Sequence, residues 1–239
     1  MASEYLKWKY RDVEHREKVE LTPAEKRKNW WHYHKWHVAA GIVLAGIAVS
    51  WGCSALGLGQ TKPDYQIAYV GKNALPDDTA AAIESAFAAY GEDLNGDGKV
   101  AVRLNQYPSG AADAQMAAST EVTLIADIME RDSYFFLLED PAAFQANYHS
   151  LRRLDGSLPE DDDYSAEGTY LAWADCPALA EQELGGYTYQ TLGKTVTGDS
   201  GELAQRLCLA RRGFWTEETC AYPEGCDTLW ERLTEGAVS

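Results

Sequence analysis

The feature that most constrains this chain is an uncharged stretch of 21 residues, 38–58, which reads VAAGIVLAGIAVSWGCSALGL. A helix of that length rises about 30 Å, which matches the hydrocarbon thickness of a bilayer. We therefore predict that residues 38–58 form a single transmembrane helix. A lipoprotein attached through Cys53 and a buried core helix are the two alternatives.

The flanks of this stretch predict its orientation. Lys26, Arg27, Lys28 and Lys35 precede it, whereas only Lys62 follows closely. Cytoplasmic flanks of membrane helices are enriched in Lys and Arg, and Trp and Tyr gather at the membrane interface. The aromatic and histidine-rich run 30–37 fits such an interface. We expect residues 1–37 to form a cytoplasmic stub and the rest of the chain to lie outside the cell membrane.

Charge divides the chain in the same way. Residues 1–37 carry nine Lys/Arg and six Asp/Glu, a net charge of +3, whereas residues 60–239 carry a net charge of −19. The formal net charge of the whole chain is −16. Nucleic-acid binding depends on a basic surface that displaces counterions from phosphates. Because the chain is acidic overall, we expect no nucleic-acid partner.

The start of a helix is visible just before the uncharged stretch. In Thr22-Pro23-Ala24-Glu25, Thr22 suits the N-cap, Pro23 the first helical position and Glu25 the third. This helix is expected to continue into the membrane segment.

Beyond a predicted linker, 59–64, strand-like and helix-like patterns alternate through residues 65–239. Runs rich in β-branched and aromatic residues predict strands, and apolar residues at helical spacing predict helices between them. That order favours right-handed crossovers and a mostly parallel sheet, so the predicted fold class is α/β. The predicted strands are 65–70, 100–104, 133–138, 170–173 and 203–214, and the predicted helices are 76–90, 116–129, 141–148 and 227–233.

Two of these helices show an apolar stripe that we expect to face the core. Ile83, Ala86, Phe87 and Tyr90 lie on one face of the first helix. On the second helix, Val122, Ile125 and Met129 recur at a similar spacing and are the expected core positions.

Ligands of open α/β sheets usually bind at the carboxyl ends of the strands. The segments predicted at those ends are 71–73, 105–107 and 139–140. Their polar members give the candidate ligand-binding residues Asn73, Tyr107, Glu139 and Asp140.

The most specific motif is Asp-Leu-Asn-Gly-Asp-Gly-Lys-Val, residues 93–100. It matches the opening of an EF-hand-like or dockerin-like calcium loop, with oxygens at positions 1, 3 and 5 and a Gly at position 6. Calcium is therefore the one expected cofactor, with Asp93, Asn95, Asp97 and the carbonyl of Lys99 as ligands. Position 12 is Leu104, not an acid, so the alternative is a tight turn that uses Asn, Asp and Gly for their left-handed conformations.

Four cysteines follow the uncharged stretch, and an even number permits disulfides. Cys220 and Cys226 bracket a five-residue loop that a disulfide could close, while Cys176 and Cys208 have no neighbouring partner in the sequence. Unpaired buried thiols are the alternative. No Cys-x-x-Cys occurs, which argues against a zinc or redox site.

We predict that the chain is not an enzyme. His149 is the sole histidine after residue 37, and neither a Gly-x-Ser-x-Gly elbow nor a phosphate-binding loop occurs. The expected function is a membrane-anchored extracytoplasmic module that binds an unidentified ligand or protein. The alternative is a cell-surface hydrolase with paired carboxylates, such as Glu139 and Asp140.

Several short segments of the sequence also resemble segments of known proteins. The segments 35–37, 62–65, 93–100, 134–141 and 211–217 are similar to strings in uncharacterised single-pass membrane-anchored proteins of Gram-positive anaerobes. The strand–helix order with an acidic strand end resembles one lobe of an extracellular solute-binding protein. This resemblance implies a ligand-binding surface domain and no known activity.

Overall fold

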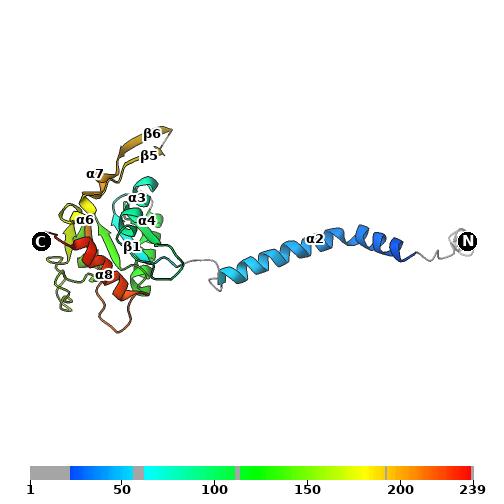
Figure 1. Ribbon diagram of the computed structural model, residues 1–239, viewed down its shortest axis with the longest axis horizontal. Helices are drawn as coiled ribbons and strands as arrows, with labels where there is room; N and C mark the ends of the chain where they lie inside the picture. The colour runs from blue at the N-terminus through cyan, green and yellow to red at the C-terminus, as the bar shows by residue number, and fades with distance from the viewer. Residues whose placement is uncertain (1–21, 56–61, 111–113, 192, 238–239) are drawn as a thin grey trace, which may run out of the picture. The chain divides into compact units, whose positions relative to one another are not determined.

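The structure is a computed structural model that describes residues 22–55, 62–110, 114–191 and 193–237, with side chains in the first range described as far as Trp51. It divides into two compact units, Met1–Gln60 and Thr61–Ser239. Figure 1 shows a single long helix in the first unit and a layered α/β body in the second.

The helix of the first unit, α2, runs from Pro23 to Ala55. The predicted capping motif is confirmed. The amide and hydroxyl of Thr22 donate to the carboxylate of Glu25, at 2.9 and 2.7 Å, and the Glu25 amide donates back to the Thr22 hydroxyl at 3.4 Å. This reciprocal bonding satisfies donors that a bare helix start would leave free.

Within the part of the chain that the structure describes, no helix is both long enough and apolar enough to cross a bilayer. The predicted span 38–58 extends beyond that part, because α2 is described to Ala55 and its side chains only to Trp51. The apolar side chains that are described on α2 are exposed, among them Ile42, Leu44 and Trp51.

The second unit is built on a five-stranded sheet with the order β2-β1-β3-β7-β4. The strands β2, β1 and β3 are parallel, and β7 enters antiparallel between β3 and β4. This confirms a mixed α/β fold with a mostly parallel sheet. The strands of this sheet are β1 (Tyr65–Gly71), β2 (Val102–Pro108), β3 (Phe135–Leu138), β4 (Tyr170–Ala172) and β7 (Cys208–Arg211).

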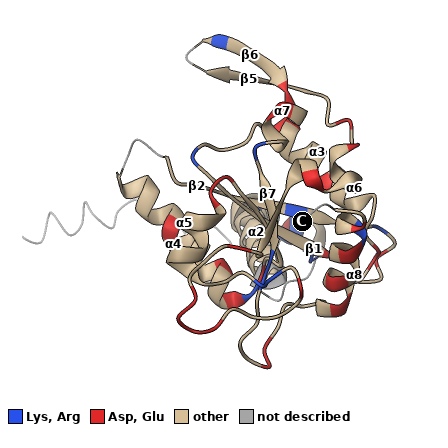
Figure 2. Ribbon diagram, turned by 90° about the vertical axis from the view of Figure 1, so that its left-hand side faces the viewer, with Lys and Arg blue, Asp and Glu red and all other residues tan. Residues whose placement is uncertain are grey.

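Helices cover both faces of the sheet, as Figure 2 shows with α4 and α5 on one side and α3, α6 and α8 on the other. Alternation along β3 explains the two layers: Phe135 and Leu137 join the larger core under α3 and α8, whereas Phe136 and Leu138 join the smaller core under α4 and α5. The helices are α3 (Asp77–Ala88), α4 (Ala114–Glu130), α5 (Pro141–Tyr148), α6 (Pro177–Ala180), α7 (Ser200–Ala204) and α8 (Pro223–Thr234), with a 3-10 turn η1 (Trp173–Asp175).

The expected core stripe of α3 is confirmed at Ile83, Ala86 and Phe87, which are buried. The expected stripe of α4 is wrong. Val122 and Met129 are 67% and 70% exposed, and α4 buries Leu124 and Asp127 instead. The helix is turned toward the sheet by a polar contact, because the buried carboxylate of Asp127 accepts hydrogen bonds from partners in β2 and before β3.

The carboxyl-terminal third departs most from expectation. The predicted strand 203–214 is in fact the end of α7, a turn and the short strand β7. A two-stranded antiparallel hairpin, β5 (Gly186–Thr191) and β6 (Lys194–Asp199), was not predicted. It projects from the body above α7 in Figures 1 and 2.

Candidate functional site

A cavity of about 460 Å³ lies at the carboxyl ends of β1 and β3. Its walls come from three places: the strand ends, the segment that leads into α3, and the projecting hairpin with α7. The cavity is lined by Tyr69, Asn73, Ala74, Leu75, Pro76, Asp77, Glu139, Tyr187, Tyr189, Leu203 and Arg206.

The floor of this cavity is a small hydrogen-bonded network around Tyr69. The Tyr69 hydroxyl lies 3.0 Å from Oε1 of Glu139 and 2.8 Å from the carbonyl oxygen of Asn73. The other carboxylate oxygen of Glu139 accepts the amide of Lys72 at 2.7 Å. Burial and then the neighbouring Glu139 charge raise the pKa of Tyr69, so its hydroxyl stays protonated and remains a donor.

Gly71 allows this network to form. A Cβ atom at this position would lie 2.1 Å from the Tyr69 hydroxyl and 2.8 Å from the carboxyl carbon of Glu139. Both distances are far below contact, so any larger residue at position 71 would displace the network.

The aromatic wall of the cavity is contributed by the hairpin. Tyr187 and Tyr189 project from the same face of β5, with ring centroids 6.0 Å apart and an angle of 24° between the rings. The hairpin is attached to α3, because the Thr188 amide donates to the carboxylate of Asp78 at 3.0 Å. Two stacked tyrosine rings therefore line the cavity together with residues of the strand ends.

Charge in the cavity is of both signs. Asp77 and Glu139 are acidic, and Arg206 is basic. Arg206 is exposed and forms no ion pair with any residue that the structure describes. Its guanidinium is therefore available to a ligand, with up to five N–H donors.

Of the four predicted ligand-binding residues, the structure brings Asn73 and Glu139 together in this cavity. Tyr107 lies elsewhere, because β2 continues to Pro108 and places residue 107 inside the sheet. The Tyr107 side chain is buried under α4 and its hydroxyl donates to Asp127 at 2.6 Å.

Asp140 also lies outside the cavity. It is the N-cap of α5, where its carboxylate accepts the amide of Ala143 at 2.9 Å. Glu139 and Asp140 both border a neighbouring cavity of about 380 Å³, next to α5. Each carboxylate thus has a structural partner that holds its position.

The predicted calcium-loop residues form a compact turn. Asp93 accepts the amides of Gly96, Asp97 and Gly98, at distances of 2.7 to 3.2 Å. The loop is anchored by the carboxylate of Asp64, which is 3% exposed and accepts three amides, those of Leu94, Asn95 and Ala101.

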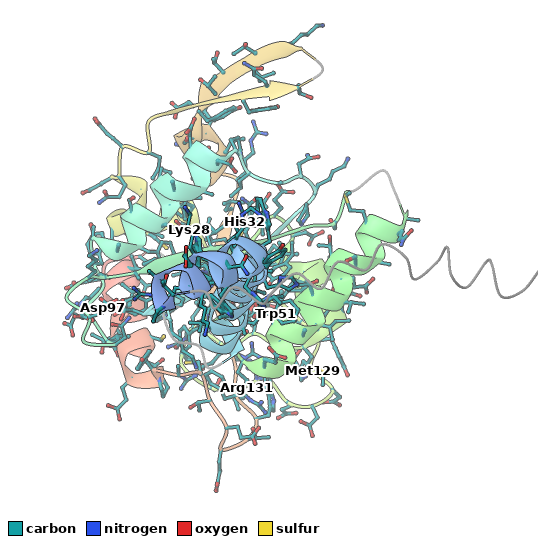
Figure 3. All side chains as sticks on the ribbon, turned by 90° about the vertical axis from the view of Figure 1, so that its right-hand side faces the viewer. Lys28, His32, Trp51, Asp97, Met129 and Arg131 are labelled. Atoms are coloured by element: carbon teal, nitrogen blue, oxygen red, sulfur yellow. The ribbon has the colours of Figure 1, made fainter. Side chains whose placement is uncertain are left out.

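The same bonding leaves acceptor sites on the loop. Asn95 and Asp97 each accept one amide through a side-chain oxygen, and a carboxylate offers more lone pairs than one such bond uses. Asp97 is exposed, as its position at the edge of the body in Figure 3 also indicates. Among the side chains that the structure describes, no group of three or more His, Cys, Asp or Glu is placed to hold a metal ion.

Cys176, Cys208, Cys220 and Cys226 are present as free thiols. Cys220 and Cys226 interact directly: a hydrogen bond from the Cys226 thiol lowers the pKa of Cys220, and the same bond raises the pKa of Cys226. The two residues that bracket the five-residue loop are therefore neighbours in the fold.

Sequence reasoning missed the hairpin tyrosines and Arg206. A signal for the hairpin was present, since residues 186–191 and 194–199 are rich in Thr and Tyr and flank Gly193, whose φ is +74°. Comparisons of the chain with protein-family models, with curated proteins and with solved structures find no match.

Proposed function

We propose that the chain is a membrane-anchored extracytoplasmic binding module whose ligand occupies the cavity at the carboxyl ends of β1 and β3. One observation carries this proposal: two parallel tyrosine rings, an unpaired guanidinium and a fixed carboxylate line one cavity of about 460 Å³. A concave site with apolar walls and a few positioned polar groups is the usual form of a small-molecule site.

The lining favours an uncharged polyhydroxylated ligand, such as a fragment of a cell-surface glycan. Tyrosine rings offer flat apolar faces with a polar edge, to which the weakly polar face of a sugar ring can stack. Glu139 accepts and Arg206 donates hydrogen bonds, so together they match hydroxyl groups, which do both. The opposite charges also make a strongly charged ligand a poorer fit.

The test is a thermal melt of the full chain in detergent micelles, in the presence of cell-wall oligosaccharides, short peptides or metal salts. A glycan fragment at 100 times its dissociation constant stabilises the fold by about 2.7 kcal/mol, which raises the melting temperature by several degrees. Tyr189→Ala and Arg206→Gln should abolish the shift. Tyr170→Ala is the matched control, since Tyr170 is exposed to a similar degree, 37% against 43%, and does not line the cavity.

A glycan shift that survives both cavity substitutions, or no shift with any glycan, would exclude this site assignment. The hydrolase alternative gives a different result in the same samples. It predicts time-dependent cleavage of the oligosaccharide that Glu139→Gln abolishes, whereas binding alone leaves the oligosaccharide intact.

Anchoring is supported by the uncharged and exposed side chains of α2 over residues 39–51, preceded by Trp30, Trp31 and the basic run 26–28. The expected topology places residues 1–37 in the cytoplasm. Protease added to intact, wall-stripped cells should degrade residues 61–239 and spare a tag at Met1. A protected carboxyl-terminal domain would contradict this orientation, and recovery of the chain in the soluble fraction would contradict the anchor.

A further inference from the structure

The outward face of α4 carries an apolar stripe that the fold leaves uncovered. Val122, Ile125 and Met129 lie on one face of the helix and are 67%, 39% and 70% exposed. They are spaced by three and four residues, so they form a continuous line along the helix axis. Apolar side chains exposed in a line of this kind mark an interaction surface more often than scattered ones do.

The stripe ends at a second cavity, of about 440 Å³, to which Met129 itself contributes. Figure 3 shows Met129 and Arg131 at the same end of α4. Aromatic and basic residues contribute much of the remaining wall, among them His149, Arg212 and Trp215. None of these residues lines the cavity with the tyrosine wall.

Arg212 gives this cavity a buried positive charge. The residue is only 5% exposed, and its guanidinium donates to the carbonyl oxygens of Ser133, at 3.3 Å, and Ile128. It forms no ion pair with any residue that the structure describes, and its Nε has no hydrogen-bond partner there. The guanidinium also lies over the Phe214 ring, 5.7 Å from its centroid, and its acidic neighbours, Asp127 and Asp132, act on it through charge without an ion pair. A buried guanidinium without a directly bonded carboxylate favours a further anion.

A second arginine in the cavity already holds a carboxylate. Nη2 of Arg131 lies 2.7 Å from Oε2 of Glu218, whose side chain is 75% exposed. The same guanidinium reaches the hydroxyl of Thr216 at 3.5 Å. An exposed ion pair of this kind contributes little to stability, so another carboxylate can replace Glu218 at low cost.

We propose that this cavity and the α4 stripe together bind the carboxyl-terminal tail of a partner protein that ends in apolar residues. The terminal carboxylate lies between Arg131 and Arg212, and the apolar side chains that precede it lie along Met129, Ile125 and Val122. A cationic cavity on a domain of strongly negative charge selects an anionic group, and the adjoining stripe selects an apolar body.

The dimensions fit a short peptide. Val122 and Met129 are seven residues apart, so the stripe is about 10 Å long at the helical rise of 1.5 Å per residue. An extended peptide advances about 3.3 Å per residue, so three residues cover the stripe. The terminal residue then occupies the cavity, which gives a recognition unit of roughly four residues.

The probe is a peptide with the ending Gly-Gly-Leu-Val-Leu-Leu, labelled with fluorescein at its amino terminus and made as a free acid and as a carboxamide. Binding to the full chain in detergent micelles is measured by fluorescence anisotropy. The free acid should bind at least tenfold more tightly than the carboxamide, because the amide has lost the anionic group. Equal affinities, or no binding of the acid, would overturn the proposal.

Variants separate this site from the tyrosine-walled cavity. Arg131→Gln and Met129→Glu should each lower the affinity for the free-acid peptide by tenfold or more. Glu218→Gln should raise this affinity several-fold, because it removes the carboxylate that competes for Arg131. Arg206→Gln is the matched loss of a guanidinium in the other cavity and should leave the affinity unchanged. A Glu218→Gln variant that binds no better than the parent, or an Arg206→Gln variant that loses binding, would also contradict the proposal.

Discussion

The hydroxyl groups of Thr79 and Ser200 are 2.8 Å apart in a fully buried contact that joins the first turn of α3 to the start of α7. Ser200 directly follows the hairpin, and its amide donates to the carbonyl of Gly185 at 2.9 Å, across the base of β5 and β6. This pair of hydroxyls therefore fixes the hairpin, and with it Tyr187 and Tyr189, over the strand ends.

Removing both of these hydroxyls should cost less stability than the sum of removing each one alone. Ser200→Ala leaves the Thr79 hydroxyl buried without a partner and should lower the free energy of unfolding by about 1–3 kcal/mol. Combining it with Thr79→Val removes the unsatisfied group, so the double variant should be less destabilised than the sum of the single variants. Urea unfolding of the four proteins measures this coupling, and strictly additive losses would show that the two hydroxyls do not act as a pair.

Gly71→Ala should disrupt the cavity floor. The added methyl group would overlap the Tyr69 hydroxyl, so the Tyr69–Glu139 contact must open. We expect a loss of about 1–3 kcal/mol, as for other overpacked sites, together with the loss of any ligand-induced thermal shift. Gly41→Ala is the control, because a Cβ atom there meets nothing within 4 Å. Equal melting temperatures and ligand shifts for both variants would contradict the assigned role of Gly71.

The domain should lose stability at alkaline pH. Burial is the main cause that raises the pKa values of Tyr69, Tyr107 and Tyr134. The unfolded chain releases these protons near pH 10 and the folded chain keeps them, so the free energy of unfolding falls as pH rises above about 10. Each tyrosine contributes up to 1.4 kcal/mol per pH unit there. Urea unfolding between pH 8 and 11 should show a shallower fall for Tyr107→Phe than for Tyr164→Phe, which replaces an exposed tyrosine; parallel falls would contradict the prediction.

Calcium should stabilise the loop 93–99 weakly. Without an acid at the twelfth position, a dissociation constant on the order of 10⁻⁴–10⁻³ M is expected. At 10 mM calcium this gives about 1.4–2.7 kcal/mol, which appears as a higher melting temperature than in chelator. Asp97→Ala should abolish the calcium shift, because it removes a ligand and keeps the amide bonds of Asp93.

Asp162→Ala, the loss of an exposed acid in another loop, is the control for the calcium shift. Identical melting curves of the parent chain in calcium and in chelator would leave residues 93–99 as a turn that Asp64 anchors.

Cys220 and Cys226 should form a disulfide when the chain is exposed to a disulfide donor such as oxidised glutathione. Closing so short a loop stabilises by about 2 kcal/mol in the chain-entropy model, so reduction should lower the melting temperature by roughly 4–8 °C. Peptide mapping without reductant identifies the link, and Cys220→Ser should remove both the link and the effect of reductant. Cys208→Ser should retain both; a reductant effect that persists in Cys220→Ser would assign it to other thiols.

Local sequence signals predicted the amino-terminal part of the fold well. The strands β1 and β3 carry strongly strand-like sequences, and the helix α5 and the capping of α2 depend on contacts between near neighbours, so all four lie where expected. The buried face of α4 does not follow from the spacing of its apolar residues. It is set by Asp127, whose carboxylate accepts hydrogen bonds from Tyr107 and Ser133. A polar residue turns one face of a helix toward the core only when hydrogen-bond partners from other elements are there, and the local sequence does not show where those partners lie.

The candidate cavity was half predicted for a related reason. Asn73 and Glu139 follow strands that pair directly, so the edge rule for parallel sheets placed them together. Tyr189 comes from the hairpin and Arg206 from the turn that follows α7, both more than 40 residues further along the chain. Their position depends on the antiparallel pairing of β7 with β3. No local sequence pattern predicts that pairing.

The place of β7 also determines when the domain can become complete. Phe135–Leu138 is buried along its whole length, and one of its two neighbours is Cys208–Arg211, about 70 residues later. Until residue 211 has left the ribosome, the most apolar strand of the sheet has one bare edge, a state that invites pairing between chains. The nascent domain therefore has to be kept apart from its copies until late in its synthesis, and chains truncated before residue 208 should aggregate where the full chain does not.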